Sequence, residues 1–147
     1  MKFYRRLSTI KAISFDLDDT LYSNRPVMVA IEQKMIAYFA DLAVIQKASA
    51  GYSQGLNHHF WSTFRQQAVI EQPNLAHDVV KVRLVTYHLG FVFLGLTERE
   101  AKQQAQAALD YFISLRSDFT VPEASKKLLS DLEKHYPLIA ISNGNVD

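Results

Sequence analysis

Three acidic residues within four positions follow a short apolar segment near the start of the chain. The segment runs from Ile10 to Phe15 and predicts a buried β-strand, and the acids that come after it are Asp16, Asp18 and Asp19. Carboxylates are rare in the core of a strand, so the cluster favours chemistry over packing. The alternative is a strand followed by an Asx-type turn, in which aspartate serves only local hydrogen bonding.

Two neighbouring carboxyl groups suit a displacement at phosphorus. Asp16 would attack as the nucleophile and form an aspartyl-phosphate, while Asp18 would protonate the leaving oxygen and later take a proton from water. An anionic nucleophile that approaches an anionic phosphate calls for a hard divalent cation with oxygen ligands, and Mg²⁺ is the expected ion. The hydroxyl of Thr20 would orient the acids, and Asp19 would cap the following turn.

A second apolar segment, residues 138–141, lies far downstream and predicts a second buried, parallel strand. Ser142 follows this strand as Asp16 follows the first. Ligands bind at the carboxyl ends of the strands in open α/β sheets, so the two residues are expected at one cleft. The Ser142 hydroxyl and the backbone N–H groups of Asn143 and Gly144 would hold a phosphoryl oxygen.

Residues 15–22 and 141–144 resemble the first and second motifs of the haloacid dehalogenase-like (HAD) hydrolase superfamily. The resemblance implies an α/β fold with a Rossmann-like parallel-sheet core, and Mg²⁺-dependent phosphatase activity. It implies Asp16 as nucleophile and metal ligand, Asp18 as acid and base with its backbone carbonyl on the metal, and Ser142 on the phosphate. Dehalogenases of the superfamily lack the second acid, so the presence of Asp18 favours phosphoryl transfer.

More than a hundred residues separate the two motifs, whereas a simple βαβ unit takes about 30. Helices are predicted over about 26–45, 56–69 and 75–88 from apolar residues at helical spacing, capping signals and prolines. A fourth predicted helix begins at the capping box of Thr97 and Glu100, and a fifth at a similar signal of Thr120 and Glu123. We therefore expect a helical cap domain, residues 24–118, inserted into a core of residues 1–23 and 119–147.

The resemblance implies that such a cap closes over the cleft and selects the substrate. Arg83, on a predicted cap helix near Asp78, is a candidate substrate contact. The alternative is an exposed arginine that forms a helix-surface ion pair.

Several stretches are similar to one branch of the superfamily, the bacterial phosphatases that act on FMN and on 5-amino-6-(5-phospho-D-ribitylamino)uracil, an intermediate of riboflavin synthesis. They are Phe3-Tyr4-Arg5, residues 16–22 with 24–27, His77-Asp78-Val79 with Arg83, and residues 141–145. Enzymes of this type commonly hydrolyse several sugar and nucleotide phosphates. The expected partner is thus a small-molecule phosphate ester.

The superfamily has a third motif, a lysine, and a fourth, an acidic pair, both downstream of the second, whereas this chain ends at Asp147. We therefore expect a C-terminally truncated phosphatase with only two strands in its sheet. Alone it would be poorly active or inactive, and it would self-associate through the open sheet, because unpaired edges and uncovered apolar faces attract further chains.

The amino-acid composition argues against several classes of protein. The 147 residues are 48% hydrophobic and 21% charged, which is ordinary for a soluble globular protein. Sixteen basic against fifteen acidic residues, without a basic block, do not indicate a nucleic-acid binder. The absence of cysteine excludes disulfides and thiolate metal sites and fits a reducing cytoplasm. The longest apolar run, residues 89–96, is too short to span a membrane.

Other functions use similar residues. A phosphomutase of the same superfamily would use the same acids. A phosphorylation-receiving signalling domain also accepts phosphate on aspartate, but it alternates strands and helices throughout, so a long helical insertion is out of place. A non-catalytic helical binding module with incidental strands is the third alternative.

Overall fold

The computed structural model describes residues 9–42 and 56–142. Contacts between Cα atoms divide the chain into two units. Over the described residues, the first unit comprises residues 9–25 and 120–142 and holds both strands, and the second comprises residues 26–42 and 56–119 and is helical. The predicted assignment of these units to a core and a cap remains a prediction.

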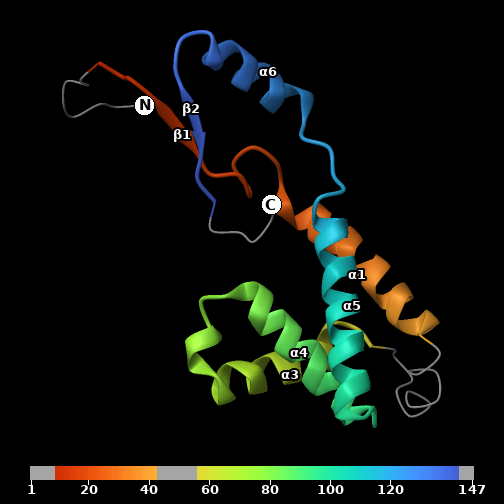
Figure 1. The fold of residues 1–147 in the computed structure, drawn as a ribbon. Helices are drawn as coiled ribbons and strands as arrows, with labels where there is room; N and C mark the ends of the chain where they lie inside the picture. The colour runs from red at the N-terminus through yellow and green to blue at the C-terminus, as the bar shows by residue number, and fades with distance from the viewer. Residues whose placement is uncertain (1–8, 43–55, 143–147) are drawn as a thin grey trace. The chain divides into compact units, whose positions relative to one another are not determined.

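The first unit contains a two-stranded parallel sheet (Figure 1). Strands β1 (Ile13–Phe15) and β2 (Leu138–Ala140) pair in register from Ile13 opposite Leu138 to Phe15 opposite Ala140. The N–H of Ile141 continues the pairing and donates to the carbonyl oxygen of Phe15 at 2.8 Å. The two predicted strands are therefore present and parallel, with a long helical segment between them in the sequence.

The sheet is not buried as the sequence predicted. Ser14 of β1 is exposed, and the side chains of Ile139 and Ile141 are 52% and 60% exposed. The prediction that Ile10 begins the first strand is also wrong, because β1 begins at Ile13. The physical reason is that the described part of this unit contains one complete helix, α6, which is too little to cover both faces of a sheet.

Helix α6 (Glu123–Glu133) leads into β2, and its start differs from the prediction. The expected capping box of Thr120 and Glu123 does not form. Pro122 occupies the N-cap with extended backbone angles and no side-chain cap bond, which places Glu123 in the first helical position rather than the third. The carboxylate of Glu123 instead pairs with Lys126 at 2.8 Å.

The helical unit is built from four α-helices and one short 3₁₀ helix among the described residues. They are α1 (Asn24–Asp41), α3 (His58–Glu71), η2 (Pro73–Leu75), α4 (Val79–Phe93) and α5 (Glu98–Arg116), with the first two residues of α1 in the other unit. Helix α4 packs against both α3 and α5 (Figure 1). The helices predicted from apolar spacing are thus confirmed, with changes at their ends.

An aromatic core holds these helices together. Phe39 of α1 and Phe91 of α4 are almost completely buried, and the ring of Trp61 from α3 lies 4.6 Å from Phe39 and 5.6 Å from Phe91 between centroids. The indole N–H of Trp61 donates to the carbonyl oxygen of Leu56 at 3.1 Å, so its polar atom is satisfied inside the core. Small buried side chains of α5, such as Ala105, let this helix approach α4 closely.

The third predicted helix is displaced by several residues. It was expected over about 75–88, but η2 precedes it and α4 runs from Val79 to Phe93. Asp78 is the N-cap and accepts a hydrogen bond from the N–H of Lys81 at 2.9 Å, which satisfies a helix donor that otherwise lacks a partner. This contact lowers the pKa of the half-buried Asp78 carboxyl.

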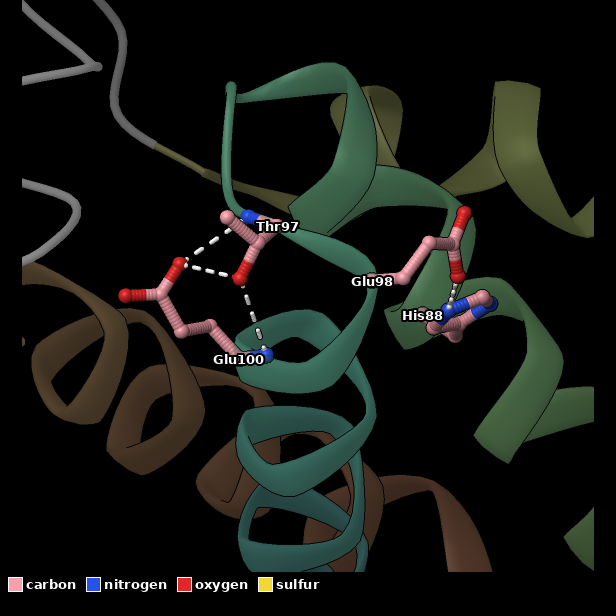
Figure 2. Close-up of polar contacts among 4 residues, drawn as sticks. All are labelled: His88, Thr97, Glu98 and Glu100. Carbon is pink, nitrogen blue, oxygen red and sulfur yellow. Dashed lines mark hydrogen bonds and ion pairs between the residues drawn. The ribbon is translucent and has the colours of Figure 1, made fainter.

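The start of α5 matches the prediction. The Thr97 hydroxyl accepts from the N–H of Glu100 at 3.4 Å, and the Glu100 carboxylate accepts from the N–H of Thr97 at 3.0 Å (Figure 2). This reciprocal capping box is the one that the sequence indicated.

Some predictions fall outside the described residues, among them the Phe3-Tyr4-Arg5 stretch and the end of the first predicted helix, residues 43–45. Among the helices in the described part of the chain, none combines the length and the apolar character that crossing a membrane requires.

Candidate active site

The acid loop, residues 16–22, leaves the carboxyl end of β1 and reverses direction at once. The N–H groups of Thr20 and Leu21 both donate to the carbonyl oxygen of Leu17, at 3.3 and 3.0 Å. Asp19 lies in the left-handed region with φ of 57°, which aspartate tolerates better than most residues. The chain can therefore place several carboxyl groups within a single tight turn.

The three acids have different surroundings. Asp16 is exposed and has no hydrogen bond or ion pair to any other part of the chain that the structure describes. Asp18 is half-buried and accepts a short hydrogen bond from the hydroxyl of Tyr22. Asp19 accepts from the N–H of Asn24, the first residue of α1, at 2.8 Å. Asp19 was predicted to cap the following turn, whereas its carboxylate bonds to the first residue of α1. Asp16 is the acid that has no such contact among the described residues.

The Thr20 hydroxyl bonds to no other group in the part of the chain that the structure describes. The side chain of Thr20 is exposed, and the hydrogen bond that this residue donates to the carbonyl oxygen of Leu17 comes from its backbone N–H. The hydroxyl of Tyr22 bonds to Asp18 instead. A role for Thr20 therefore stays a prediction. The sequence analysis did not single out the contact of Tyr22, although this residue lies four positions after the acid that it holds.

Asp16 directly follows β1, and Ser142 lies two residues after the end of β2. Because the strands are parallel and Phe15 pairs with Ala140, the two strands end side by side at one edge of the sheet. The bond from Ile141 to Phe15 joins the strands at this end. Ser142 is exposed. Asn143 and Gly144, the other predicted phosphate ligands, lie outside the described residues.

A second positioning contact comes from α6. The Ser125 hydroxyl donates to the carbonyl oxygen of Leu21 at 2.6 Å and joins the helix to the acid loop across 104 residues of sequence. Nothing in the sequence around Ser125 indicates this contact, because a single serine on a helix has no periodic pattern that points to a distant loop.

The acid loop offers the type of ligand atom that a hard cation prefers. These ligand atoms are carboxylate and carbonyl oxygens, which suit Mg²⁺, and Asp16 has its carboxylate available. Asp18 would contribute its backbone carbonyl while its side chain bonds to Tyr22. No group of three or more acidic, histidine or cysteine side chains suited to a metal occurs within residues 9–42 and 56–142, so these two donors are only part of an octahedral shell.

Arg83 lies on α4 in the helical unit. Its guanidinium stacks on the Phe112 ring, 3.6 Å from the ring centroid, and Nη1 donates to the Tyr87 hydroxyl at 3.4 Å. The alternative, an ion pair at the helix surface, is not seen among the described residues. Arg83 has no carboxylate partner among the residues that the structure describes, and Asp78 pairs with Lys81 at 3.1 Å.

The surroundings of Arg83 are aromatic and half-buried. Burial raises the pKa of the Tyr87 phenol, although the positive charge of Arg83 acts in the opposite direction. Tyr87 therefore stays protonated at neutral pH and keeps its hydroxyl as a hydrogen-bonding group beside Arg83. Contact of Arg83 with a substrate stays a prediction.

Sequence and structure comparisons found proteins that are similar to this chain. No family model matches it. Over 145 residues it is 35% identical to a protein of Escherichia coli (strain K12) named 5-amino-6-(5-phospho-D-ribitylamino)uracil phosphatase YigB, with 99% of this chain and 58% of that protein covered. The chain thus spans little more than half the length of this curated relative.

A solved structure agrees in fold. The crystal structure of a 2-haloacid dehalogenase from Pseudomonas syringae pv. Tomato DC3000 superimposes with a TM-score of 0.80 at 26% sequence identity, over 95% of this chain and 57% of that one. Both the sequence relative and the structural relative carry the names of hydrolases. The resemblance is therefore confirmed: over almost its whole length, this chain is similar in sequence and in fold to the haloacid dehalogenase-like hydrolases.

Proposed function

We propose that the protein is a Mg²⁺-dependent phosphomonoester hydrolase that works through an aspartyl-phosphate. The observation that carries this proposal is the pairing of β1 with β2, which brings the residues after each strand, Asp16 and Ser142, to one edge of the sheet. The similarity to a protein named as a phosphatase supports it.

In the first half-reaction, a carboxylate oxygen of Asp16 attacks phosphorus and the bond from phosphorus to the ester oxygen breaks. Asp18 gives its proton to that leaving oxygen, so the alcohol departs neutral. In the second, Asp18 takes a proton from water, whose oxygen attacks phosphorus. Inorganic phosphate is released and the carboxylate of Asp16 is restored.

The contacts of the acid loop fit these two roles. A nucleophile needs an accessible oxygen, and Asp16 is exposed without a partner in the described residues. An acid and base needs a fixed direction, and Tyr22 fixes the Asp18 carboxyl from one side. Ser125 limits movement of the loop by holding the carbonyl of Leu21.

The Asp16 carboxylate and the Asp18 backbone carbonyl would hold the Mg²⁺ ion. When bound, the ion offsets the charge repulsion between carboxylate and phosphate. The Ser142 hydroxyl, with the N–H groups of Asn143 and Gly144, would donate hydrogen bonds to the phosphoryl oxygens that do not react.

The substrate class is a small phosphorylated metabolite such as 5-amino-6-(5-phospho-D-ribitylamino)uracil or FMN. The name of the Escherichia coli relative supports this choice. Arg83 would contact the substrate, because its guanidinium lacks a carboxylate partner among the described residues and is held flat by Phe112. A cytoplasmic location belongs to the same proposal.

The test measures release of phosphate from both compounds by the full product of the gene, with Mg²⁺ and with a chelator. We expect Asp16→Asn to abolish turnover and Asp18→Asn to lower it by at least about a hundredfold. Asp19→Asn is the matched control, since it changes a third acid of the same loop but keeps an oxygen that can accept from Asn24.

Acid-stable labelling offers a second readout. A radioactive phosphoryl group from the substrate should remain on the quenched protein and disappear in Asp16→Asn. Full activity of Asp16→Asn, or equal losses in Asp16→Asn and Asp19→Asn, would contradict the mechanism.

A second candidate is the release of halide from 2-haloacids, which the name of the structural relative favours. The presence of Asp18 speaks against it, since the superfamily resemblance associates this acid with phosphoryl transfer. Halide release from 2-chloropropionate without phosphatase activity would establish this candidate. A phosphomutase would require a phosphorylated activator and would release no net phosphate.

Self-association through the sheet is part of the proposal for the chain as it stands. Ile139 and Ile141 present apolar surface at the strands, and unpaired strand edges bind further strands. Sedimentation velocity should show concentration-dependent dimers or larger species, which Ile139→Lys should reduce. A monomer at all concentrations would contradict it.

A further inference from the structure

A groove with a volume of about 860 Å³ lies along α4 and α5 in the helical unit. Leu84 and Val85 of α4 and Ala105 of α5 supply apolar surface to its lining, and Ala105 is only 1% exposed. This volume lies within the range of roughly 300–1,000 Å³ that is usual for small-molecule sites. Arg83 is not among the lining residues, so the groove is separate from the aromatic cluster around that residue.

Two cations of the groove have no anionic partner in the part of the chain that the structure describes. Arg99 and Lys102 both line it and, three residues apart on α5, lie on the same side of the helix. Neither forms an ion pair or a recorded hydrogen bond with the residues that the structure describes. Both are exposed at the surface, so an incoming anion meets them before it reaches the apolar lining.

The carboxylates of the groove have hydrogen-bond partners within the protein. Glu98 bonds to Nε2 of His88 at 2.9 Å, which ties the start of α5 to α4 (Figure 2). Asp110 accepts a hydrogen bond from the side-chain amide of Gln106 at 2.8 Å. Both carboxylates keep their negative charge but are held by these donors, whereas Arg99 and Lys102 have no such partner among the described residues.

We propose that this groove binds a small organic anion that has an apolar body, such as an aromatic or aliphatic sulfonate, phosphate or carboxylate. The anionic group lies between Arg99 and Lys102, and the apolar body lies on Leu84, Val85 and Ala105. A purely apolar ligand would leave the two cations unused, and a simple inorganic anion would leave the apolar lining open to water. The combination of both surfaces selects an amphipathic anion.

The test compares two dyes that share an aromatic body but differ in charge. They are 8-anilinonaphthalene-1-sulfonate, which is an anion, and N-phenyl-1-naphthylamine, which is neutral. Fluorescence titration of the complete chain should give at least about fivefold tighter binding of the anion. Amide shifts from nuclear magnetic resonance should place both dyes at residues 84–88 and 98–110.

The variant Arg99→Gln/Lys102→Gln should bring the two affinities within about twofold of each other. Lys126→Gln/Lys127→Gln on α6 is the matched control, with two exposed lysines that do not line the groove, and should leave the difference unchanged. Retained binding of the neutral dye shows that the groove of the double variant is intact.

A measurement on the unchanged protein does not depend on any variant. Raising the salt concentration from about 0.05 to 0.5 M should weaken the anionic dye several-fold and leave the neutral dye unaffected, because salt screens exposed charges. Equal affinity for the two dyes, an anion preference that survives Arg99→Gln/Lys102→Gln, or shifts confined to the strands at Ile139 and Ile141 would each overturn the proposal.

Discussion

Gly90→Ala should destabilise the helical unit, although the same change usually stabilises a helix. Gly90 lies in the interior of α4 and is buried against Trp61 of α3. A Cβ atom at this position would overlap Cζ3 of the indole and lie 3.0 Å from Cε3 and 3.3 Å from Cη2. The indole cannot move aside easily, since it packs against Phe39 and Phe91 and bonds to Leu56.

The magnitude follows from two opposing terms. Helix propensity favours alanine over glycine by about 1 kcal/mol, whereas forcing an extra carbon into a packed core costs about 1–3 kcal/mol. Displacement of the indole would also weaken its hydrogen bond to Leu56, which contributes about 1 kcal/mol. The expected net loss in the free energy of unfolding is therefore roughly 1–3 kcal/mol.

Urea denaturation followed by far-ultraviolet circular dichroism measures this loss, and the fluorescence of Trp61, the only tryptophan, reports on the same contact. In a Trp61→Phe background the smaller ring removes most of the overlap, so the added Gly90→Ala change should cost at least about 1 kcal/mol less than it does beside tryptophan.

Gly95→Ala serves as the control. Gly95 has φ of 91° with open space around its Cβ position, so its cost of about 1 kcal/mol comes from backbone strain. That cost should be the same with tryptophan or phenylalanine at position 61. Equal losses for Gly90→Ala in the two backgrounds, or a gain in stability beside Trp61, would refute the packing argument.

Three further predictions concern single hydrogen bonds. Tyr22→Phe removes the hydroxyl that holds Asp18 and should lower kcat for phosphate release by on the order of tenfold, with KM nearly unchanged; an unchanged kcat would contradict this. Ser125→Ala removes the bond to the acid loop and should speed amide hydrogen exchange in that loop, with a loss of about 1 kcal/mol in unfolding free energy; unchanged exchange would argue against the anchor. Thr97→Ala should cost about 1 kcal/mol at pH 7. The hydrogen bond from the Thr97 side chain lowers the pKa of Glu100 in the folded state, so this stabilisation is present above the ordinary carboxyl pKa and is lost as the pH falls through the lowered one. The gap between Thr97→Ala and the unchanged chain should therefore narrow at pH 3, and a constant gap in urea titrations would be inconsistent with this linkage.

Features that depend on neighbours in sequence were predictable. The apolar residues of α1, including Ile31, Met35 and Phe39, recur at helical spacing and are buried as that spacing requires. The capping box of Thr97 and Glu100 needs only residues three apart, and it forms as predicted. Helical periodicity and capping bonds can be predicted from the sequence because they depend on residues only a few positions apart.

The first residue of a helix was less predictable where one side chain or one proline decided between two possible starts. Asp78 was expected inside the third helix, but its carboxylate stabilises the helix start better from the N-cap, so α4 begins after it. Thr120 and Glu123 have the spacing of a capping box, but Pro122 takes the N-cap and the box is lost. The residue types alone do not distinguish the predicted helix start from the observed one, because the same residues are compatible with both.

By itself, the sequence determined that three acids follow one short strand and that a serine follows another, because apolar runs and polar turns are local patterns. A parallel second strand was expected from the two apolar runs, but its register against the first strand, with Phe15 opposite Ala140, was decided only by the tertiary structure. The tertiary structure also decided that Tyr22 holds Asp18 and that Ser125 holds the loop across 104 residues. Contacts between distant residues form when the chain packs, and a single hydrogen bond of this kind leaves no periodic pattern in the sequence.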